Sequence, residues 1–412
     1  MQAEIRRSII SGSAEAPPSV PHAHRAIMIS LLTPGQTQIS GAPPSQGIAA
    51  TIAACRSFGA DIVQSEGIID VFGPEEIIAP RELHCGGCNT TLKLMLPLCA
   101  SLGSEMKVSG AEGLSRKNLS PFFGFIEAAG AKAEYGGSLP ASIAGPLSVE
   151  EQLYPGMLGS QFLSGLLLCA PLLLQDASIG VDGAVPGWQY VKDTMAMMKE
   201  YGIRFYSDSP DFLSLPGGQE YSPPEDVRVP SSPYLSSYLL LAGALCGKAT
   251  LKGSCDWQAH SGIFRQFGAG ISIRKHEISV STGSLSGVEM DALFAGMLLP
   301  HALALASAAK GESKFTGMNA LPRHHQSRAK KLCRELGRMG AKITEQGNSI
   351  IVTGGKLSGA KIEPEGDAAV AMACAAAAAC AQGPTTINGS ECIGASYPNF
   401  FRDLSSIGAI VR

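Results

Sequence analysis

The chain has 412 residues, a length that predicts two domains rather than one hydrophobic core. With 45% hydrophobic and 16% charged residues, it has the composition of a globular α/β protein and not of a disordered one. The net charge of −3 provides no broad basic field, so we expect no nucleic-acid partner.

Two segments bear on targeting and membrane insertion. Residues 1–19 mix charged residues, Gly and Pro, and they have no apolar core of the kind found in a signal peptide. The Ala-rich run at residues 368–381 is shorter than the ~20 residues needed to span a bilayer, and it predicts a buried helix. We therefore expect a cytoplasmic protein without a membrane partner. The 11 cysteines, an odd number, are predicted to be reduced core thiols.

A short pattern recurs six times along the chain. In each copy an apolar or small residue is followed by Gly and then by Ala or Ile; the glycines are Gly59, Gly130, Gly202, Gly268, Gly340 and Gly408. These glycines are separated by 71, 72, 66, 72 and 68 residues. Each except the last precedes a segment of alternating apolar and polar residues, which predicts a helix, a Gly stop and a strand hairpin.

A second glycine pattern lies in phase with the first. The spacing Gly-x-x-x-apolar-x-Gly occurs at residues 35–41, 247–253, 311–317 and 383–389, with looser versions at residues 104–110 and 177–183. Each copy predicts a strand that enters a turn. Together the two patterns predict six copies of a helix, a strand, a second helix and a hairpin, in some cyclic order. The alternative is chance recurrence of common Gly turns. The period exceeds that of common solenoids and favours a compact repeat fold.

Several local motifs occur in a familiar order. Residues 16–26 contain a Pro-rich loop and the start of a helix, residues 86–93 read GGCNTTLK, and residues 159–163 read GSQFL. These resemble the first substrate loop, the Gly-Asn-Ser-Gly-Thr loop and the Ser-Ser-Gln-Phe-Leu element of the enolpyruvylshikimate phosphate synthase (3-phosphoshikimate 1-carboxyvinyltransferase) family. Further landmarks of that family match Tyr190, Tyr238, Pro300, Arg328 and residues 367–373.

The resemblance implies an α/β fold of two domains. This is the enolpyruvyl transferase fold, an inverse α/β barrel-like arrangement with three of the six helix-plus-sheet repeats in each domain. It implies an inserted domain at residues 20–228 and a second domain made of residues 1–19 plus 229–412, with the active cleft between them. The Pro-rich segment at residues 207–233 is predicted to hold the return crossing. We expect a monomer, because each half buries its own core.

The resemblance also implies a chemistry. The family joins phosphoenolpyruvate to the 5-hydroxyl of shikimate 3-phosphate and releases phosphate, without a cofactor. Several Lys and Arg side chains must hold two phosphates and two carboxylates. A carboxylate must take the hydroxyl proton, and an acid must protonate the vinyl carbon. The implied partner is thus a small anionic substrate similar to shikimate 3-phosphate.

The residues that match the family's substrate-binding positions lie mostly on the side of the phosphorylated acceptor. Arg25, Ser160, Gln161 and Tyr190 match residues that grip the acceptor and its phosphate. Lys93 and Lys117 stand where the family has arginines for phosphoenolpyruvate. The remaining matches are Ser19 in the first loop, Asn89 and Thr90 in the Gly-rich loop, and Arg328.

Other family positions have lost their charge. Val20 replaces the lysine of the first loop, Met297 the carboxylate base, Ala369 an arginine and Ala395 the last active-site lysine; His324 and His325 replace a Lys-Glu pair. Losing a general base typically costs ~10²- to 10⁴-fold in rate. The sequence therefore favours a diverged activity over an efficient synthase.

Histidines and cysteines near these positions suggest replacement chemistry. His324 and His325 are candidate acid–base residues, because histidine titrates near neutral pH. Cys85 and Cys88 form a C-x-x-C motif that, with His22 and His301, is a candidate metal site. The alternative is that these are ordinary structural histidines and core thiols. Three functional interpretations follow: the family transferase, an enzyme of the same fold acting on another small anion, and a noncatalytic ligand-binding homologue.

Overall fold

The chain forms two compact units. The computed structural model describes residues 1–258 and 260–412 in full, and the backbone of residue 259. One unit, here the inserted unit, comprises residues Ser19–Val229; the other, the terminal unit, comprises Met1–Pro18 and Pro230–Arg412. Each boundary lies one residue from the position expected from the sequence. Each unit has its own hydrophobic core.

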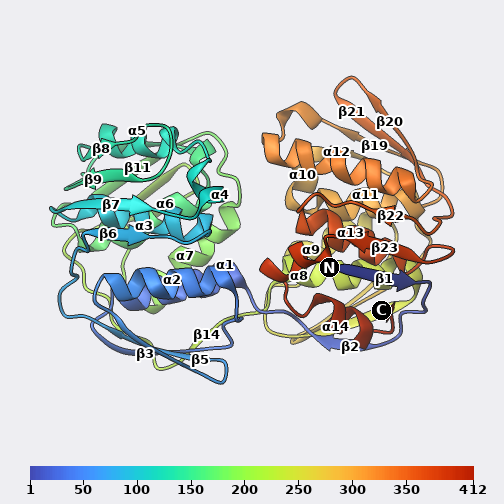
Figure 1. Ribbon diagram of the computed structural model, residues 1–412, viewed down its shortest axis with the longest axis horizontal. Coiled ribbons are helices and arrows are strands. Elements are labelled where there is room, and N and C mark those ends of the chain that lie inside the picture. Colours follow the sequence, from blue (N-terminus) through green and yellow to red (C-terminus); the bar gives the residue numbers. More distant parts are fainter. The chain divides into compact units, whose positions relative to one another are not determined.

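All six sheets have four strands and share one topology (Figure 1). In each sheet an edge strand runs parallel to the second strand, and the second, third and fourth strands pair antiparallel. Along the chain, a buried helix leads into the second strand, and an amphipathic helix then leads into the hairpin. The predicted repeat of helix, strand, helix and hairpin is confirmed.

The inserted unit contains three sheets, with the strand orders β14–β3–β5–β4, β6–β7–β9–β8 and β10–β11–β13–β12. Its strands are β3 (Gly35–Ser40), β4 (Asp61–Ser65), β5 (Ile68–Gly73), β6 (Glu82–His84), β7 (Glu105–Ser109), β8 (Lys132–Glu134), β9 (Ala141–Ala144), β10 (Gln152–Pro155), β11 (Ala177–Asp182), β12 (Ser207–Asp208), β13 (Phe212–Leu215) and β14 (Val227–Arg228). Its helices are α1 (Val20–Leu31), α2 (Gln46–Ser57), α3 (Asn89–Ser101), α4 (Glu112–Ser115), α5 (Ser120–Ala128), α6 (Ser160–Cys169), α7 (Trp188–Glu200), η1 (Gly156–Leu158) and η2 (Ala170–Leu172).

The terminal unit repeats this plan, with the orders β16–β17–β15–β2, β18–β19–β21–β20 and β22–β23–β1–β24. Its strands are β1 (Gln2–Arg6), β2 (Ser13–Glu15), β15 (Lys248–Lys252), β16 (Gly270–Arg274), β17 (Glu277–Ser281), β18 (Glu289–Asp291), β19 (Glu312–Thr316), β20 (Lys342–Gln346), β21 (Ser349–Thr353), β22 (Lys361–Ile362), β23 (Thr385–Asn388) and β24 (Ile410–Val411). Its helices are α8 (Pro233–Cys246), α9 (Gln258–Gln266), α10 (Ala292–Ala295), α11 (Leu299–Ala308), α12 (Arg323–Arg338), α13 (Ala368–Ala378), α14 (Phe400–Ser406), η3 (Gly296–Leu298), η4 (Met318–Ala320) and η5 (Ser390–Ala395).

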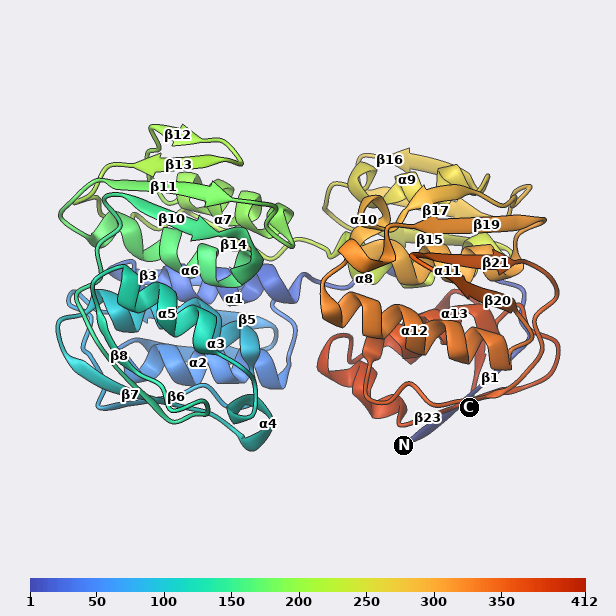
Figure 2. The same cartoon turned by 90° about the horizontal axis from the view of Figure 1, so that it is seen from above.

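The sixth repeat is completed by the two ends of the chain. Strand β24 near the C-terminus pairs with β1 near the N-terminus instead of with a hairpin partner. Figures 1 and 2 show both termini beside this sheet. This pairing explains why the sixth glycine of the sequence pattern is not followed by a predicted hairpin.

Each repeat glycine terminates a helix, as predicted. Gly59, Gly130, Gly202, Gly268, Gly340 and Gly408 all have positive φ values, between 85° and 110°. Only glycine adopts this conformation without a steric cost.

Three helices fill the centre of each unit. Helices α1, α3 and α6 of the inserted unit, and α8, α11 and α13 of the terminal unit, are buried along most of their length. The Ala-rich run forms α13 and is buried as predicted. Among the described residues, no helix combines the length and apolarity needed to cross a bilayer.

The contact between α3 and α6 depends on Gly165. A Cβ atom added there would lie 2.4 Å from the carbonyl oxygen of Leu94. The two helix backbones are therefore too close to leave room for any side chain at this position. Gly124 on the exposed side of α5 has no heavy atom within 4 Å of the same position.

We expect Gly165→Ala to destabilise the protein by roughly 1–3 kcal/mol, because overpacking would push α3 and α6 apart. Gly124→Ala, a matched control, should stabilise the protein by up to about 1 kcal/mol through helix propensity. Guanidinium unfolding of both variants measures the difference. Equal stability of the two variants would contradict this account of the helix contact.

Candidate functional site

The N-terminal halves of three helices meet around Arg25 in the inserted unit. This residue of α1 donates from Nε to Thr194 Oγ1 of α7 at 2.7 Å, and from Nη2 to Ser164 Oγ of α6 at 2.9 Å. The two hydroxyl oxygens are themselves 2.8 Å apart. The network fixes the starts of α1, α6 and α7 relative to one another.

A second network adds the start of α3. The Nδ2 atom of Asn89 donates to Oε1 of Gln161 at 3.3 Å, and Nε2 of Gln161 donates to Oγ1 of Thr90 at 2.7 Å. The N-termini of four helices are thereby tied together in one unit. Free backbone N–H groups and aligned peptide dipoles make such helix ends favourable for anions.

Arg25 is a buried cation held by neutral oxygens. Its side chain is 1% exposed, and its third bond runs from Nη1 to the carbonyl oxygen of Pro21 at 2.8 Å. Among the described residues it forms no ion pair with a carboxylate. Burial lowers the pKa of Arg25 to about 10, as expected for a charge removed from water. An anion bound nearby would relieve this cost.

Ser160 and Tyr190 lie beside this network. Ser160 is the first residue of α6, and the guanidinium carbon of Arg25 lies 5.6 Å from the centre of the Tyr190 ring. A Cβ atom added at Gly187 would lie 2.8 Å from Ser160 Oγ and 3.1 Å from Tyr190 Cδ2. The glycine, with φ of 77°, therefore allows both polar side chains to approach the same place.

Lys93 and Lys117 form a pair of like charges. The Nζ atom of Lys93 on α3 lies 4.5 Å from the ring centre of Phe122. Burial, and secondly the charge of Lys117, lower the pKa of Lys93 to about 8. Neither lysine forms an ion pair with a described carboxylate. The pair is suited to an anionic ligand.

Ser19, predicted to bind substrate, is the N-cap residue of α1. Its hydroxyl caps α1 by accepting a hydrogen bond from the backbone N–H of His22 at 3.4 Å, and its side chain is buried. Capping fixes the start of the helix that carries Arg25.

In the terminal unit the matched arginine is already paired. The Nε atom of Arg328 on α12 lies 2.9 and 3.1 Å from the two carboxylate oxygens of Asp367. Asp367 in turn caps α13 by accepting from the backbone N–H groups of Ala369 and Val370. Burial alone would lower the pKa of Arg328, but Tyr234 and Asp367 raise it above its ordinary value.

The four apolar residues predicted to replace charged residues of the family lie in both units. Val20 packs against the core of the inserted unit, and Ala369 is 5% exposed in the first turn of α13. Met297 lies in η3 and is partly buried, and Ala395 ends η5 at the surface.

The two candidate acid–base histidines are neighbours at the start of α12. The ring centres of His324 and His325 are 4.2 Å apart. Burial, and then the charges of His324 and Arg328, lower the pKa of His325 to about 4. The His325 imidazole is therefore neutral at pH 7, so it has no proton to donate, and its low pKa makes it only a weak base.

The candidate metal ligands belong to both units: Cys85, Cys88 and His22 lie in the inserted unit, and His301 lies in the terminal unit. Cys85 is fully buried with a pKa raised to about 12, and Cys88 caps α3 by accepting from the Thr91 N–H at 3.5 Å. His301 is fully buried, with Nε2 2.7 Å from Ser237 Oγ, and burial lowers the pKa of His22 to about 4. Among the described residues, no three His, Cys, Asp or Glu side chains are placed to hold a metal ion. A metal site formed by residues of both units stays a prediction.

Sequence reasoning missed Ser164 and Thr194. Both complete the Arg25 network, and each lies four residues after a predicted site residue, Ser160 or Tyr190. Helical spacing from those residues was the signal that could have found them.

Comparison with known proteins decides the family. The family model described as "EPSP synthase (3-phosphoshikimate 1-carboxyvinyltransferase)" matches residues 6–404. The chain belongs to the EPSP synthase family.

Curated relatives agree with this assignment. A 3-phosphoshikimate 1-carboxyvinyltransferase of Methanocorpusculum labreanum is 30% identical over 423 residues, covering 100% of both chains. The protein of the same name from Clostridium kluyveri is 28% identical and covers 98% of this chain and 96% of its own. The solved EPSP synthase of Acinetobacter baumannii superimposes with a TM-score of 0.86 at 22% identity, covering 100% of this chain and 99% of that one. The predicted enolpyruvyl transferase fold is confirmed.

We expect Lys93 to titrate near pH 8, because burial and the charge of Lys117 both disfavour its ammonium form. Lys117→Gln removes the second cause and should raise this midpoint. Because the folded pKa lies below the unfolded value, the contribution of Lys93 to stability rises as pH increases from about 8 to 10.5.

NMR of ¹³C-methylated lysines, assigned through Lys93→Gln, measures the midpoint. A midpoint near 10.5 both in the parent protein and in Lys117→Gln would show that the two lysines do not interact.

Proposed function

We propose that this EPSP synthase family protein binds a shikimate 3-phosphate-like anion through its inserted unit, and that it transfers the carboxyvinyl group of phosphoenolpyruvate slowly. The observation that carries the proposal is the buried guanidinium of Arg25, which donates to three neutral acceptors and forms no ion pair among the described residues, although the charge of Asp193 acts on it from a greater distance. A buried cation of this kind costs stability unless an anion is bound.

The surrounding polar groups support the acceptor side of the proposal. Hydrogen bonds between helices hold the side-chain donors of this region in place before a ligand binds. The residues concerned are Arg25, Ser160, Gln161 and Tyr190. Fixed donors reduce the entropy lost on binding. Asn89 and Thr90 orient Gln161 from the neighbouring helix.

The residues matched to phosphoenolpyruvate binding offer weaker interactions than those of the family. Lys93 and Lys117 keep positive charge at positions where the family has arginines, but an ammonium cannot grip a carboxylate or phosphate with two parallel bonds. Arg328 is already engaged with Asp367. Removing a partner from a buried ionic contact costs roughly 3–5 kcal/mol, and losing a general base costs ~10²- to 10⁴-fold in rate. Transfer is therefore expected to be slow.

A second candidate function follows from the histidine pair. His324 and His325 stand at the start of α12 where the family has a Lys-Glu pair, and His325 is neutral at pH 7. An enzyme acting on a different small anion could use His325 as a general base. This candidate shares the anion site of the inserted unit and differs in the chemistry.

Binding is tested with shikimate 3-phosphate alone. At about 100 times Kd the ligand should raise the midpoint of thermal unfolding by roughly 5–10 °C. Gln161→Ala should reduce this shift, because it removes the bonds that join α3 and α6. Gln64→Ala, at an exposed position of β4, is the matched control and should leave it unchanged. Absence of a shift in the parent protein would contradict the binding proposal.

Transfer is tested by phosphate release from shikimate 3-phosphate and phosphoenolpyruvate. We expect turnover at least ~10²-fold below the roughly 10 s⁻¹ of a typical enzyme, because the base is missing. Turnover at an ordinary rate would refute slow transfer. Binding without turnover, together with conversion of another small anion that is lost in His325→Ala, would favour the second candidate. Binding with no conversion would leave the noncatalytic homologue.

A further inference from the structure

The outer face of α12 in the terminal unit carries a basic groove. Its volume is about 650 Å³, and basic side chains dominate its lining. Arg323, Ser327, Lys330 and Arg334 are spaced by four, three and four residues, which places them on one face of the helix. Figure 2 shows α12 on the outside of the terminal unit.

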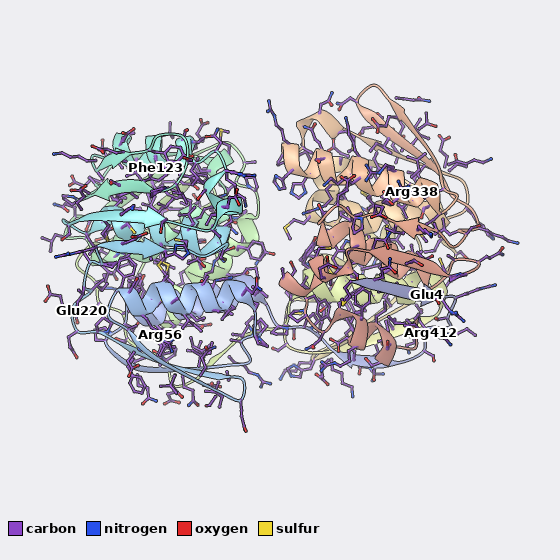
Figure 3. All side chains as sticks on the ribbon, in the orientation of Figure 1. Glu4, Arg56, Phe123, Glu220, Arg338 and Arg412 are labelled. Atoms are coloured by element: carbon purple, nitrogen blue, oxygen red, sulfur yellow. The ribbon has the colours of Figure 1, made fainter. Side chains whose placement is uncertain are left out.

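The opposite face of α12 packs into the hydrophobic core of the terminal unit. Ala329, Leu332 and Leu336 are buried, and Arg328 points to Asp367. At the C-terminal end, Arg338, labelled in Figure 3, pairs with the buried carboxylate of Glu335. The groove residues Arg323 and Lys330 take part in none of these contacts.

Positive charge in the groove exceeds negative charge. Lys331 and Arg334 share one carboxylate, with Lys331 Nζ 3.4 Å and Arg334 Nη2 2.8 Å from oxygens of Glu365. Arg323 and Lys330 are exposed and have no ion pair with any described residue. Arg334 also pairs through Nε with the buried carboxylate of Glu335 at 2.9 Å, so the excess positive charge of the groove lies on Arg323 and Lys330.

Glu365 is fixed at one end of the groove. Its backbone adopts φ of 51°, a left-handed conformation uncommon for residues other than glycine. The hydrogen bonds from Arg334 and Lys331 lower the pKa of its carboxyl group. Because this carboxylate neutralises the end near Arg334, the unpaired charge is concentrated at Arg323 and Lys330.

The spacing of those charges selects the shape of an anion. Arg323 and Lys330 are seven residues apart, which is ~10 Å along the helix axis. A single phosphate is shorter than this separation. A chain of linked phosphates can extend along the helix from Arg323 past Ser327 to Lys330. Arginine provides bidentate contacts to phosphate oxygens, and the serine hydroxyl can donate another.

We propose that this groove binds a small, extended polyphosphate, the class that includes the phosphate chain of nucleoside triphosphates. The polar lining offers little to an apolar partner. The stripe of about three turns is too short, and the chain too acidic, for nonspecific binding of nucleic acid. The site is separate from the residues assigned to the shikimate 3-phosphate-like anion.

Calorimetric titration of the full chain with sodium tripolyphosphate tests the proposal. We expect one groove site whose affinity falls at least about tenfold in the double variant Arg323→Gln/Lys330→Gln, because two charge-assisted contacts are lost. Lys248→Gln/Lys275→Gln removes the same charge from exposed positions of the terminal unit outside the groove. This control should stay within about twofold of the parent protein, since distant surface charges are screened.

The inserted unit also attracts anions, so Lys93→Gln is titrated in parallel. We expect groove binding to persist in Lys93→Gln, and ATP to bind within about tenfold of tripolyphosphate because the phosphate chain is what is recognised. Equal weakening by both double variants would mean nonspecific charge attraction and overturn the proposal. So would loss of all binding in Lys93→Gln, or failure of both tripolyphosphate and ATP to bind.

Discussion

The burial of one guanidinium group without a carboxylate partner constrains the inserted unit more than any other single contact. Arg25 joins the N-terminal halves of α1, α6 and α7, and its N–H groups donate to one carbonyl and two hydroxyl oxygens. These neutral oxygens satisfy the hydrogen-bonding geometry but cancel no charge, and the nearby charge of Asp193 offsets the burial of Arg25 only in part. The unit therefore keeps a net positive centre at the end where four helix N-termini add their dipoles. The three sheets around these helices hold that end rigid.

The two units differ in how they treat positive charge. The inserted unit leaves Arg25, Lys93 and Lys117 without described carboxylate partners. The terminal unit pairs Arg328 with Asp367 and places Met297 and Ala369 where the family resemblance implied charged groups. Arg25, on the acceptor side, forms no ion pair among the described residues, whereas Arg328 is engaged with Asp367. We propose that this difference gives the two substrates of the family reaction unequal affinities.

Much of the fold could be predicted because glycine spacing reports backbone geometry directly. The six repeat glycines are positions that need positive φ at helix ends, so their period reveals the repeat. The candidate site was only partly accessible in this way. Motif order located Arg25, Ser160 and Gln161, but the ion pair of Arg328 with Asp367 joins residues 39 positions apart and leaves no local pattern. Burial of Cys85 and His301 likewise depends on tertiary packing and leaves no signal in the C-x-x-C spacing.

The central claim is that the protein keeps the positively charged side chains that bind the phosphorylated acceptor and has lost most of those that bind phosphoenolpyruvate. Separate calorimetric titrations of the two compounds into the full chain test this most directly. The account predicts saturable binding of shikimate 3-phosphate and binding of phosphoenolpyruvate that is at least about tenfold weaker, with or without the first ligand. Tight binding of phosphoenolpyruvate to the complex with shikimate 3-phosphate would contradict it.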